Sequence, residues 1–209
     1  MSEQDKQSKR AAQEARRARK VMRKQRKTDE KHTLEAQLKE IAAAQSHKGS
    51  FHSLDNAALL FPSSETAARS NLFRLTAVMT QPVDPVALQW ALNDLVPRFP
   101  TFTSAVKRGF FWFYLEPASK PLLVAEQTKF PCRRIPLDTR HALIRVTYFS
   151  HEISVEFFHS ASDGNGGLVF LNSLVAAYLK RTGVTVTDRT NCLNHLDKPN
   201  WTETEDSFT

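Results

Sequence analysis

The chain has 209 residues and a formal net charge of +7, and that charge is concentrated at one end. Residues 1–31 contain 12 Lys and Arg against 5 Asp and Glu, whereas residues 32–209 contain 17 of each. The neutral balance of the longer part excludes a general affinity for polyanions there, and a hydrophobic content of 41% supports a folded core.

The sequence gives no sign of export or of membrane insertion. No apolar run reaches the length of a membrane-spanning helix, and the opening residues 1–5 contain no apolar signal core. Cys132 and Cys192 lie far apart in the sequence and form neither a metal-ligand spacing nor a disulfide framework. We therefore expect a cytoplasmic protein with no membrane span.

Residues 1–48 are predicted to form a basic helical or disordered tail. They contain no Pro or Gly, but only Leu34, Leu38 and Ile41 form an apolar stripe at helical spacing. This pattern favours a solvated, partly frayed helix. The alternative is a contact with nucleic acid or an anionic surface through the basic clusters at 16–20 and 23–27. Nucleic acid is the less expected partner, because no aromatic residue lies among these charges to stack on bases.

The amino-acid composition changes after a predicted linker at residues 46–50, and residues 49–209 have the composition of a folded domain. Residues 72–79 read as a strand. Asp84 is placed to cap a helix that begins at Pro85 and runs to about residue 98. Its expected core side chains are Val86, Trp90, Leu92 and Leu95.

Two strand hairpins and a second helix follow. Residues 102–107 and 110–115 are predicted to pair across Arg108 and Gly109, and residues 143–149 and 152–158 across Ser150 and His151. Residues 117–136 read as loop with one short extended piece, and residues 184–209 read as irregular. A helix over 168–180 is expected to stop at Gly183. Strands interspersed with helices predict an α/β fold: a two-layer mixed β-sheet with helices, preceded by the basic helical tail.

The candidate functional site follows the last predicted strand. Ile153, Val155 and Phe157 alternate with polar residues, and His159 falls in the same register, so it is expected on the buried or cleft-facing side. Asp163 and Gly164 complete the pattern H-x-x-x-D-G. We expect Gly164 to adopt a backbone conformation closed to other residues. An ionisable pair on a loop held between a strand and a helix is a common form of catalytic site.

Other interpretations of the same residues have less support. A histidine on an apolar strand face is often a core residue bonded to a backbone carbonyl. A phosphate cradle at Asn165–Gly167 lacks the accompanying nucleotide-binding patterns. Ser160 and Ser162 lie near His159 but outside a nucleophile-elbow motif. The aromatic run at 110–114 reads as core packing. The remaining histidines form no ligand-spaced set: His32, His47, His52, His141, His151 and His195.

The motif and the ordered segments around it resemble the acyltransferases of the chloramphenicol acetyltransferase superfamily, which includes condensation domains of peptide synthetases and alcohol acyltransferases. The similarity covers about residues 51–209 and is closest to bacterial alcohol acetyltransferases. Besides the motif, it rests on Leu54–Ala58, Asn71–Leu75, Arg98–Phe102, Gly109–Leu115, Pro131–Ile135 and Glu203–Phe208. Condensation domains usually carry a second histidine where this chain has Phe158, which favours the alcohol acyltransferase branch.

This resemblance implies a fold, a reaction and a set of roles. Residues 49–209 would be the N-terminal half of a chloramphenicol acetyltransferase-like fold, with the second half missing from the tunnel that holds the site. His159 would be the general base that activates an alcohol for attack on a thioester. Asp163 would fix the turn by pairing with an arginine, either Arg74, Arg145 or one in the second half.

The resemblance also implies the ligands. Acetyl-CoA or another acyl-CoA would be a co-substrate, an alcohol would be the acceptor, and no cofactor or metal would be bound. A competing hypothesis is an inactive half-domain that binds a partner, with the basic tail contacting nucleic acid or an anionic surface.

Overall fold

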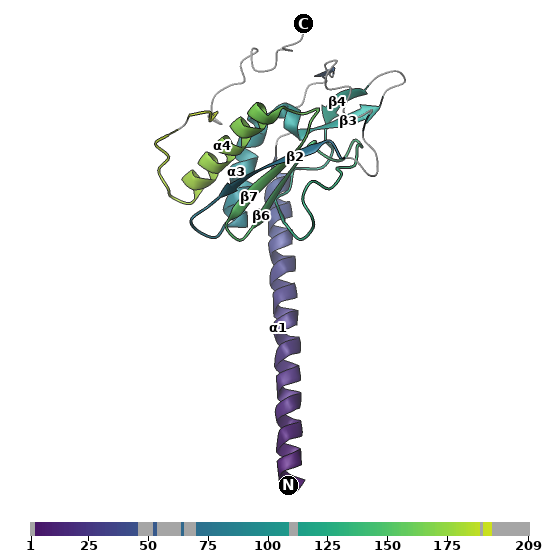
Figure 1. Cartoon of the computed structure of the whole chain (residues 1–209), viewed down its shortest axis with the longest axis vertical. Helices are drawn as coiled ribbons and strands as arrows, with labels where there is room; N and C mark the ends of the chain where they lie inside the picture. The colour runs from purple at the N-terminus through teal and green to yellow at the C-terminus, as the bar shows by residue number, and fades with distance from the viewer. Residues whose placement is uncertain are drawn as a thin grey trace. The chain divides into compact units, whose positions relative to one another are not determined.

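The computed structural model describes residues 3–45, 52–53, 64, 70–108, 113–188 and 190–193. By its internal contacts the chain divides into two compact units, residues 1–39 and residues 40–209. The first unit is helical, and its helix α1 spans Glu3–Ala43, so the last residues of α1 belong to the second unit (Figure 1). The linker predicted at 46–50, and with it the boundary at 48, lies outside the described residues.

The second unit contains two small sheets and two longer helices. One sheet has the strand order β1-β4-β3, and the other has the order β2-β7-β6-β5. β5 runs parallel to β6 while the other strand pairs are antiparallel, so the predicted mixed α/β fold is confirmed. The elements are β1 His52–Ser53, β2 Leu72–Val78, α3 Pro85–Leu95, the 3-10 turns Val96–Arg98 and Pro100–Thr103, β3 Ser104–Arg108, β4 Phe113–Pro117, β5 Ala125–Glu126, β6 Ile144–Phe149, β7 Glu152–Phe158 and α4 Gly164–Arg181.

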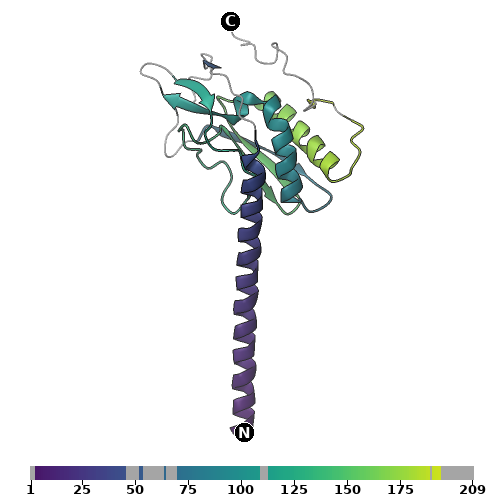
Figure 2. The ribbon, with the colours of Figure 1, turned by 180° about the vertical axis from the view of Figure 1, so that it is seen from behind.

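The helices α3 and α4 lie side by side over one face of the four-stranded sheet (Figure 2). The side chains that β7 turns toward them, Ile153, Val155 and Phe157, are fully buried. Phe170 of α4 contacts Phe157 edge-on, with ring centroids 5.9 Å apart. Alternation along β7 therefore places the apolar residues toward the helices, as its sequence pattern predicts.

Helix α3 begins where the sequence predicts and ends earlier. The Asp84 carboxylate accepts hydrogen bonds from the backbone N–H groups of Val86 and Ala87, at 2.8 and 3.3 Å. The helix ends at Leu95, and a 3-10 turn continues to Arg98. The buried face of α3 consists of Leu88, Gln89, Ala91, Leu92 and Leu95.

The prediction that Trp90 lies in the core is wrong. Leu88, Ala91 and Leu92 share one helix face at spacings of three and four residues, and Trp90 lies outside that face. Its side chain is 40% exposed and is covered by the Arg181 guanidinium, 5.7 Å from the ring. Val86, also predicted to be in the core, is half-buried.

The hairpin of β6 and β7 is confirmed, with Ser150 at a φ of 50° in its turn. β3 and β4 also pair as predicted, although β3 starts at Ser104 because the two preceding residues complete a 3-10 turn. The residues that join β3 to β4, 109–112, lie outside the described part of the chain. Among the described residues, no helix is long and apolar enough to cross a membrane.

Helix α4 starts four residues before its predicted beginning. It includes the glycines that the sequence pattern placed in a turn, and it begins at Gly164. It stops as predicted at Gly183, which has a φ of 83° and ends the helix in the left-handed region.

Candidate functional site

His159 directly follows β7 and is held by β2 on one side. Its backbone N–H donates to the carbonyl oxygen of Asn71 at 3.0 Å, which extends the β2–β7 ladder by one pair. The imidazole has the register of Phe157 and lies against Phe73 of β2, with ring centroids 4.7 Å apart and a 46° angle between the planes. His159 is half-buried, so the ring is held on an aromatic support and still reaches solvent.

Phe73 also belongs to the candidate site, although the sequence did not predict it. Its ring stacks on Phe157 at 5.1 Å as well as contacting His159. The strand alternation could have placed Phe73 on this face, but no motif distinguishes it from other core aromatics. Its contact with the imidazole supports the His159 ring from one side.

Asp163 caps helix α4. Its carboxylate accepts the backbone N–H of Gly166 at 2.8 Å, and its carbonyl oxygen accepts the N–H of Gly167 at 3.1 Å. The carboxylate is exposed, unlike the buried, arginine-paired group that the resemblance implies. The turn between the two motif residues is closed by the Ala161 N–H, which donates to the Phe158 carbonyl at 2.8 Å. Asp163 therefore fixes the turn after His159 through the start of α4.

The prediction that Gly164 adopts a backbone conformation closed to other residues is wrong. Glycine is instead required at Gly166 and Gly167, where there is no space for a side chain. The φ of Gly164 lies outside the left-handed region, and a Cβ added there would meet nothing within 4 Å. A Cβ on Gly166 would lie 2.3 Å from Ser162 Oγ. A Cβ on Gly167 would lie 3.0 Å from the Phe73 ring, so this glycine lets α4 approach β2 closely beside His159.

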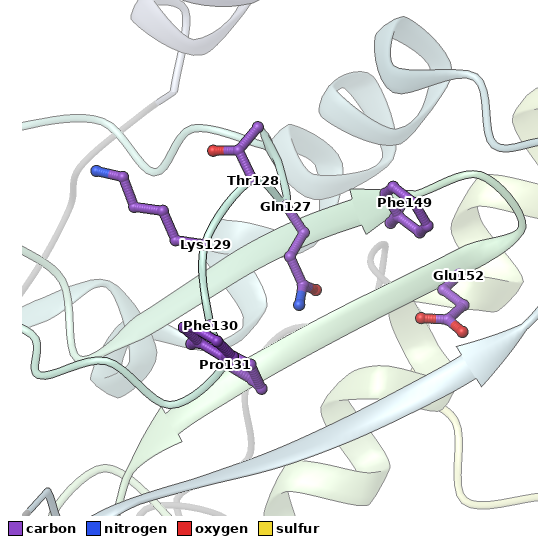
Figure 3. A pocket seen from close by; sticks show the side chains of 7 residues that line it. All are labelled: Gln127, Thr128, Lys129, Phe130, Pro131, Phe149 and Glu152. Carbon is purple, nitrogen blue, oxygen red and sulfur yellow. The ribbon is translucent and has the colours of Figure 1, made fainter.

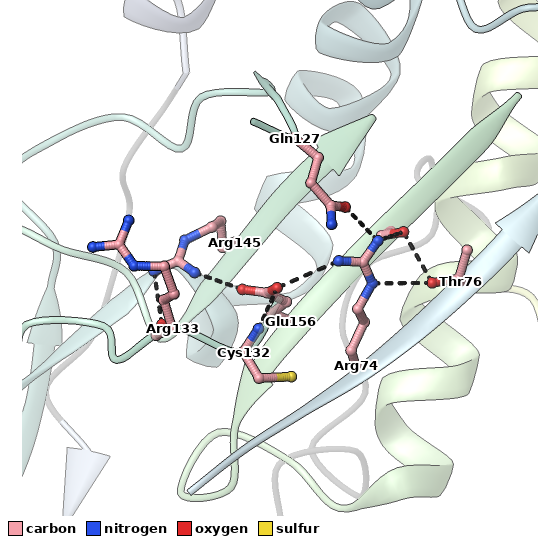
Figure 4. Close-up of polar contacts among 8 residues, drawn as sticks. Arg74, Thr76, Gln127, Cys132, Arg133, Arg145 and Glu156 are labelled. Carbon is pink, nitrogen blue, oxygen red and sulfur yellow. Dashed lines mark hydrogen bonds and ion pairs between the residues drawn. The ribbon is translucent and has the colours of Figure 1, made fainter. Parts of the chain in front are cut away.

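Arg74 and Arg145, the two arginines considered as partners of Asp163, both pair with Glu156 (Figure 4). These contacts lie on the face of the four-stranded sheet that points away from α3 and α4. Arg145 Nη1 lies 2.5 Å from one carboxylate oxygen, and Arg74 Nη1 lies 3.6 Å from the other. The three residues form one row across β2, β7 and β6, because Glu156 is in register with both arginines. The Glu156 side chain is only 3% exposed, so the two cations compensate its buried charge.

A loop covers this charged row. The backbone N–H of Cys132 donates to Glu156 Oε1 at 2.7 Å, and Gln127 accepts a hydrogen bond from Arg74. Burial, together with the nearby negative charge of Glu156, raises the pKa of the Cys132 thiol. Ser154 extends the row of polar contacts by accepting from Arg74 Nη2 at 2.7 Å.

The structure also bears on the alternative interpretations of the motif region. The Gly166 and Gly167 N–H groups that would cradle a phosphate are bonded to Asp163. The Ser162 hydroxyl donates to the Asp163 carbonyl oxygen at 3.0 Å, whereas a nucleophilic serine would donate its proton to the His159 imidazole. Within the described residues, no three or more His, Cys, Asp or Glu side chains gather as metal ligands.

A shallow hollow lies at the other end of β7 from His159 (Figure 3). It has a volume of about 420 Å³ and lies between the loop that covers Glu156 and the turn of the β6–β7 hairpin. Its lining residues are Gln127, Thr128, Lys129, Phe130, Pro131, Phe149 and Glu152. Because Glu152 begins β7 and His159 follows its last residue, this hollow is separate from the histidine site.

Comparison of the chain with known proteins identifies similar folds among solved structures but does not identify a family. No family model matches the chain, and no curated protein sequence matches it. The starter condensation domain of rhizomide synthetase RzmA has a similar structure, with a TM-score of 0.53 and 12% identity over 67% of this chain and 40% of that one.

Two further solved structures share the fold. An arginine-to-alanine mutant of the same domain, in complex with C8-CoA, has a TM-score of 0.53 and 12% identity, over 66% of this chain and 38% of that one. The SgcC5 protein from Streptomyces globisporus has a TM-score of 0.50 and 16% identity over the same shares of the two chains, 66% and 38%. The chain thus has a condensation-domain-like fold and spans about two-fifths of the length of these neighbours.

Proposed function

We propose that this chain is the histidine-bearing half of an acyltransferase that transfers an acyl group from coenzyme A to an alcohol. The observation that carries the proposal is the position of His159 at the end of β7, before a turn capped by Asp163. The condensation-domain-like fold supports it, as does the C8-CoA complex of one fold neighbour.

In this proposal the neutral imidazole of His159 accepts the hydroxyl proton while the alcohol oxygen attacks the thioester carbonyl. The carbon–oxygen bond forms, the carbon–sulfur bond breaks, and the departing CoA thiolate takes the proton from the imidazolium. A positioned base of this kind contributes about 10²–10⁴-fold to the rate. Asp163 acts on the turn and touches no substrate, and Phe73 fixes the plane of the imidazole.

In this proposal other polypeptide completes the site, and the half-buried position of His159, which leaves the ring open to solvent, supports this. A base exposed on one side neither excludes water nor holds a thioester in line for attack. The neighbours are more than twice as long as the part that this chain matches, so the remaining walls would come from sequence equivalent to their other part. The same coverage favours a second candidate function, a non-catalytic half-domain that binds a partner.

Thiol release from acetyl-CoA and octanoyl-CoA, with a set of alcohols, tests the proposal. We expect no turnover by the 209-residue chain alone, and turnover when it is co-expressed with the C-terminal half of a condensation-type acyltransferase. His159→Ala should abolish that turnover without unfolding the chain. His151→Ala, an exposed histidine in the turn at the other end of β7, is the matched control. Undiminished turnover by His159→Ala would refute the role of the base. A stable but inactive complex with the second half would favour the partner-binding function.

A further inference from the structure

The helix α1 carries a strongly basic face for which the acyl-transfer proposal has no use. Residues 16–31 hold nine Lys and Arg against two acidic residues. The side chains of residues 16–31 are exposed along this whole segment of α1. This part of the chain thus presents most of the net charge of the protein on one continuous helix (Figure 1).

The charges are sorted around the helix axis. At about 100° per residue, Arg16, Lys20, Arg23 and Lys27 lie within about 60° of one another. With a rise of about 1.5 Å per residue, these four cations form a row about 16 Å long. Asp29 lies on the far side of the helix, where it accepts from Gln25 at 3.1 Å, whereas Glu30 lies beside the row, about 20° from Arg23, and pairs with Arg26 at 2.9 Å.

Further cations flank the row on both sides. Arg17 and Lys24 lie on one flank, and Arg19 and Arg26 lie on the other, about 160° away around the axis. A helix in the major groove of B-form DNA has the groove floor beneath it and a phosphate backbone along each flank. The basic arc of α1 suits that arrangement, because the long Lys and Arg side chains of the row and of its two flanks can reach the phosphates on both sides of the groove.

The remaining surface of the helix argues against the other anionic partners. Its exposed large apolar side chains in this segment are Val21 and Met22, too little to anchor a helix in a bilayer interface. No aromatic residue lies in residues 1–31 to stack on single-stranded bases. The major groove of double-stranded RNA is too deep and narrow for such a helix.

We propose that the basic face of α1 binds B-form duplex DNA through its phosphates, without sequence preference. Gln25, an amide that could read a base, lies on the side away from the basic row. Binding would therefore depend on counterion release. With about four to six phosphate contacts, the slope of log K against log salt would be about −4 to −5.

Fluorescence anisotropy with the full chain and a labelled duplex of about 20 base pairs tests this proposal. The variant Arg16→Gln/Lys20→Gln/Arg23→Gln/Lys27→Gln should bind at least about tenfold more weakly, with a salt slope smaller by about 3 to 4. The matched control removes four exposed positive charges from the second unit: Lys120→Gln, Lys129→Gln, Arg133→Gln and Lys180→Gln. It should change the affinity less than about threefold. Circular dichroism would verify that both variants keep their helix content.

Three results would overturn the proposal. Equal weakening by the two variants would show that net charge, and no particular helix face, attracts the DNA. Binding to vesicles containing phosphatidylserine, without binding to the duplex, would assign the face to a membrane surface. Equal or tighter binding to a single strand or to duplex RNA of the same length would exclude the major-groove arrangement. Thiol release by the complemented chain should be unchanged in the α1 variant, which separates this test from that of the acyltransferase proposal.

Discussion

Gln45 is predicted to be a structural residue of the second unit, and Gln45→Ala tests this directly. Its amide joins the chain just after α1 to α3 and to the segment between β4 and β5: Nε2 donates to the Leu122 carbonyl at 2.7 Å and to Asn93 Oδ1 at 2.8 Å, and Oε1 accepts the Leu122 N–H at 2.8 Å. The side chain is nearly fully buried. The Leu122 carbonyl keeps a second donor, Gln89 Nε2 at 3.1 Å, so the main loss is the partner of the Leu122 N–H.

A buried donor left without a partner costs about 1–3 kcal/mol, and the lost hydrogen bonds add about 1 kcal/mol. We therefore expect Gln45→Ala to lower the free energy of unfolding by about 2–4 kcal/mol. For a unit of this size, that corresponds to a fall in Tm of about 4–16 °C. Urea and thermal unfolding followed by circular dichroism would measure it.

Gln81→Ala, at an exposed glutamine of the same unit, is the control and should shift stability by less than about 0.5 kcal/mol. A chain that starts at residue 49 lacks both Gln45 and the buried Ile41, and it should be less stable than the point variant. If Gln45→Ala unfolds like the wild type, the second unit does not include the end of α1, and the reasoning fails.

Three other substitutions test the site and the charges around it. Asp163→Ala should cost about 1 kcal/mol of stability through loss of the α4 cap, whereas Asp163→Asn should keep the cap and most of the stability; equal losses in chemical denaturation would rule out capping. Glu156→Gln should cost about 3 kcal/mol because Arg74 and Arg145 lose their countercharge, against little change for Glu152→Gln on the same strand. Desolvation opposes ionisation of Asp138, but hydrogen bonds from His141 and Arg140 outweigh it and hold the pKa of Asp138 well below its usual range. Its contribution to stability should be present above about pH 4 and be lost as the pH falls, so Asp138→Asn should flatten the acid side of a Tm-against-pH curve.

The strand patterns of the sequence were sufficient to predict the β6–β7 hairpin and the side on which His159 lies. Both depend on simple alternation, which burial against α3 and α4 enforces. The start of α4 was not predicted, since three glycines in four positions oppose helix formation locally. Here the Asp163 cap and the close approach of Gly167 to Phe73 outweigh that propensity.

The role of Glu156 had no signal in the sequence. Alternation along β7 marks Glu156 as a polar residue on the face away from the helices, which normally means solvent. It is buried because the irregular segment around Gln127 and Cys132 folds over that face. Such a segment has no periodicity, so neither its path nor its contacts can be derived from residue spacing.

β7 is therefore fixed from both sides, and this bears on the proposed general base. On one face Phe157 packs against Phe73 and Phe170, and on the other Glu156 bonds to Arg74 and Arg145. A general base must be held within about 0.5 Å of its productive position. His159 extends the same strand by one residue, so both sets of contacts restrict its backbone. Loss of the contacts on either face should displace the imidazole before the fold is lost. We therefore expect the Glu156→Gln variant of the complemented chain to lose the proposed acyltransferase turnover at temperatures where the variant is still folded.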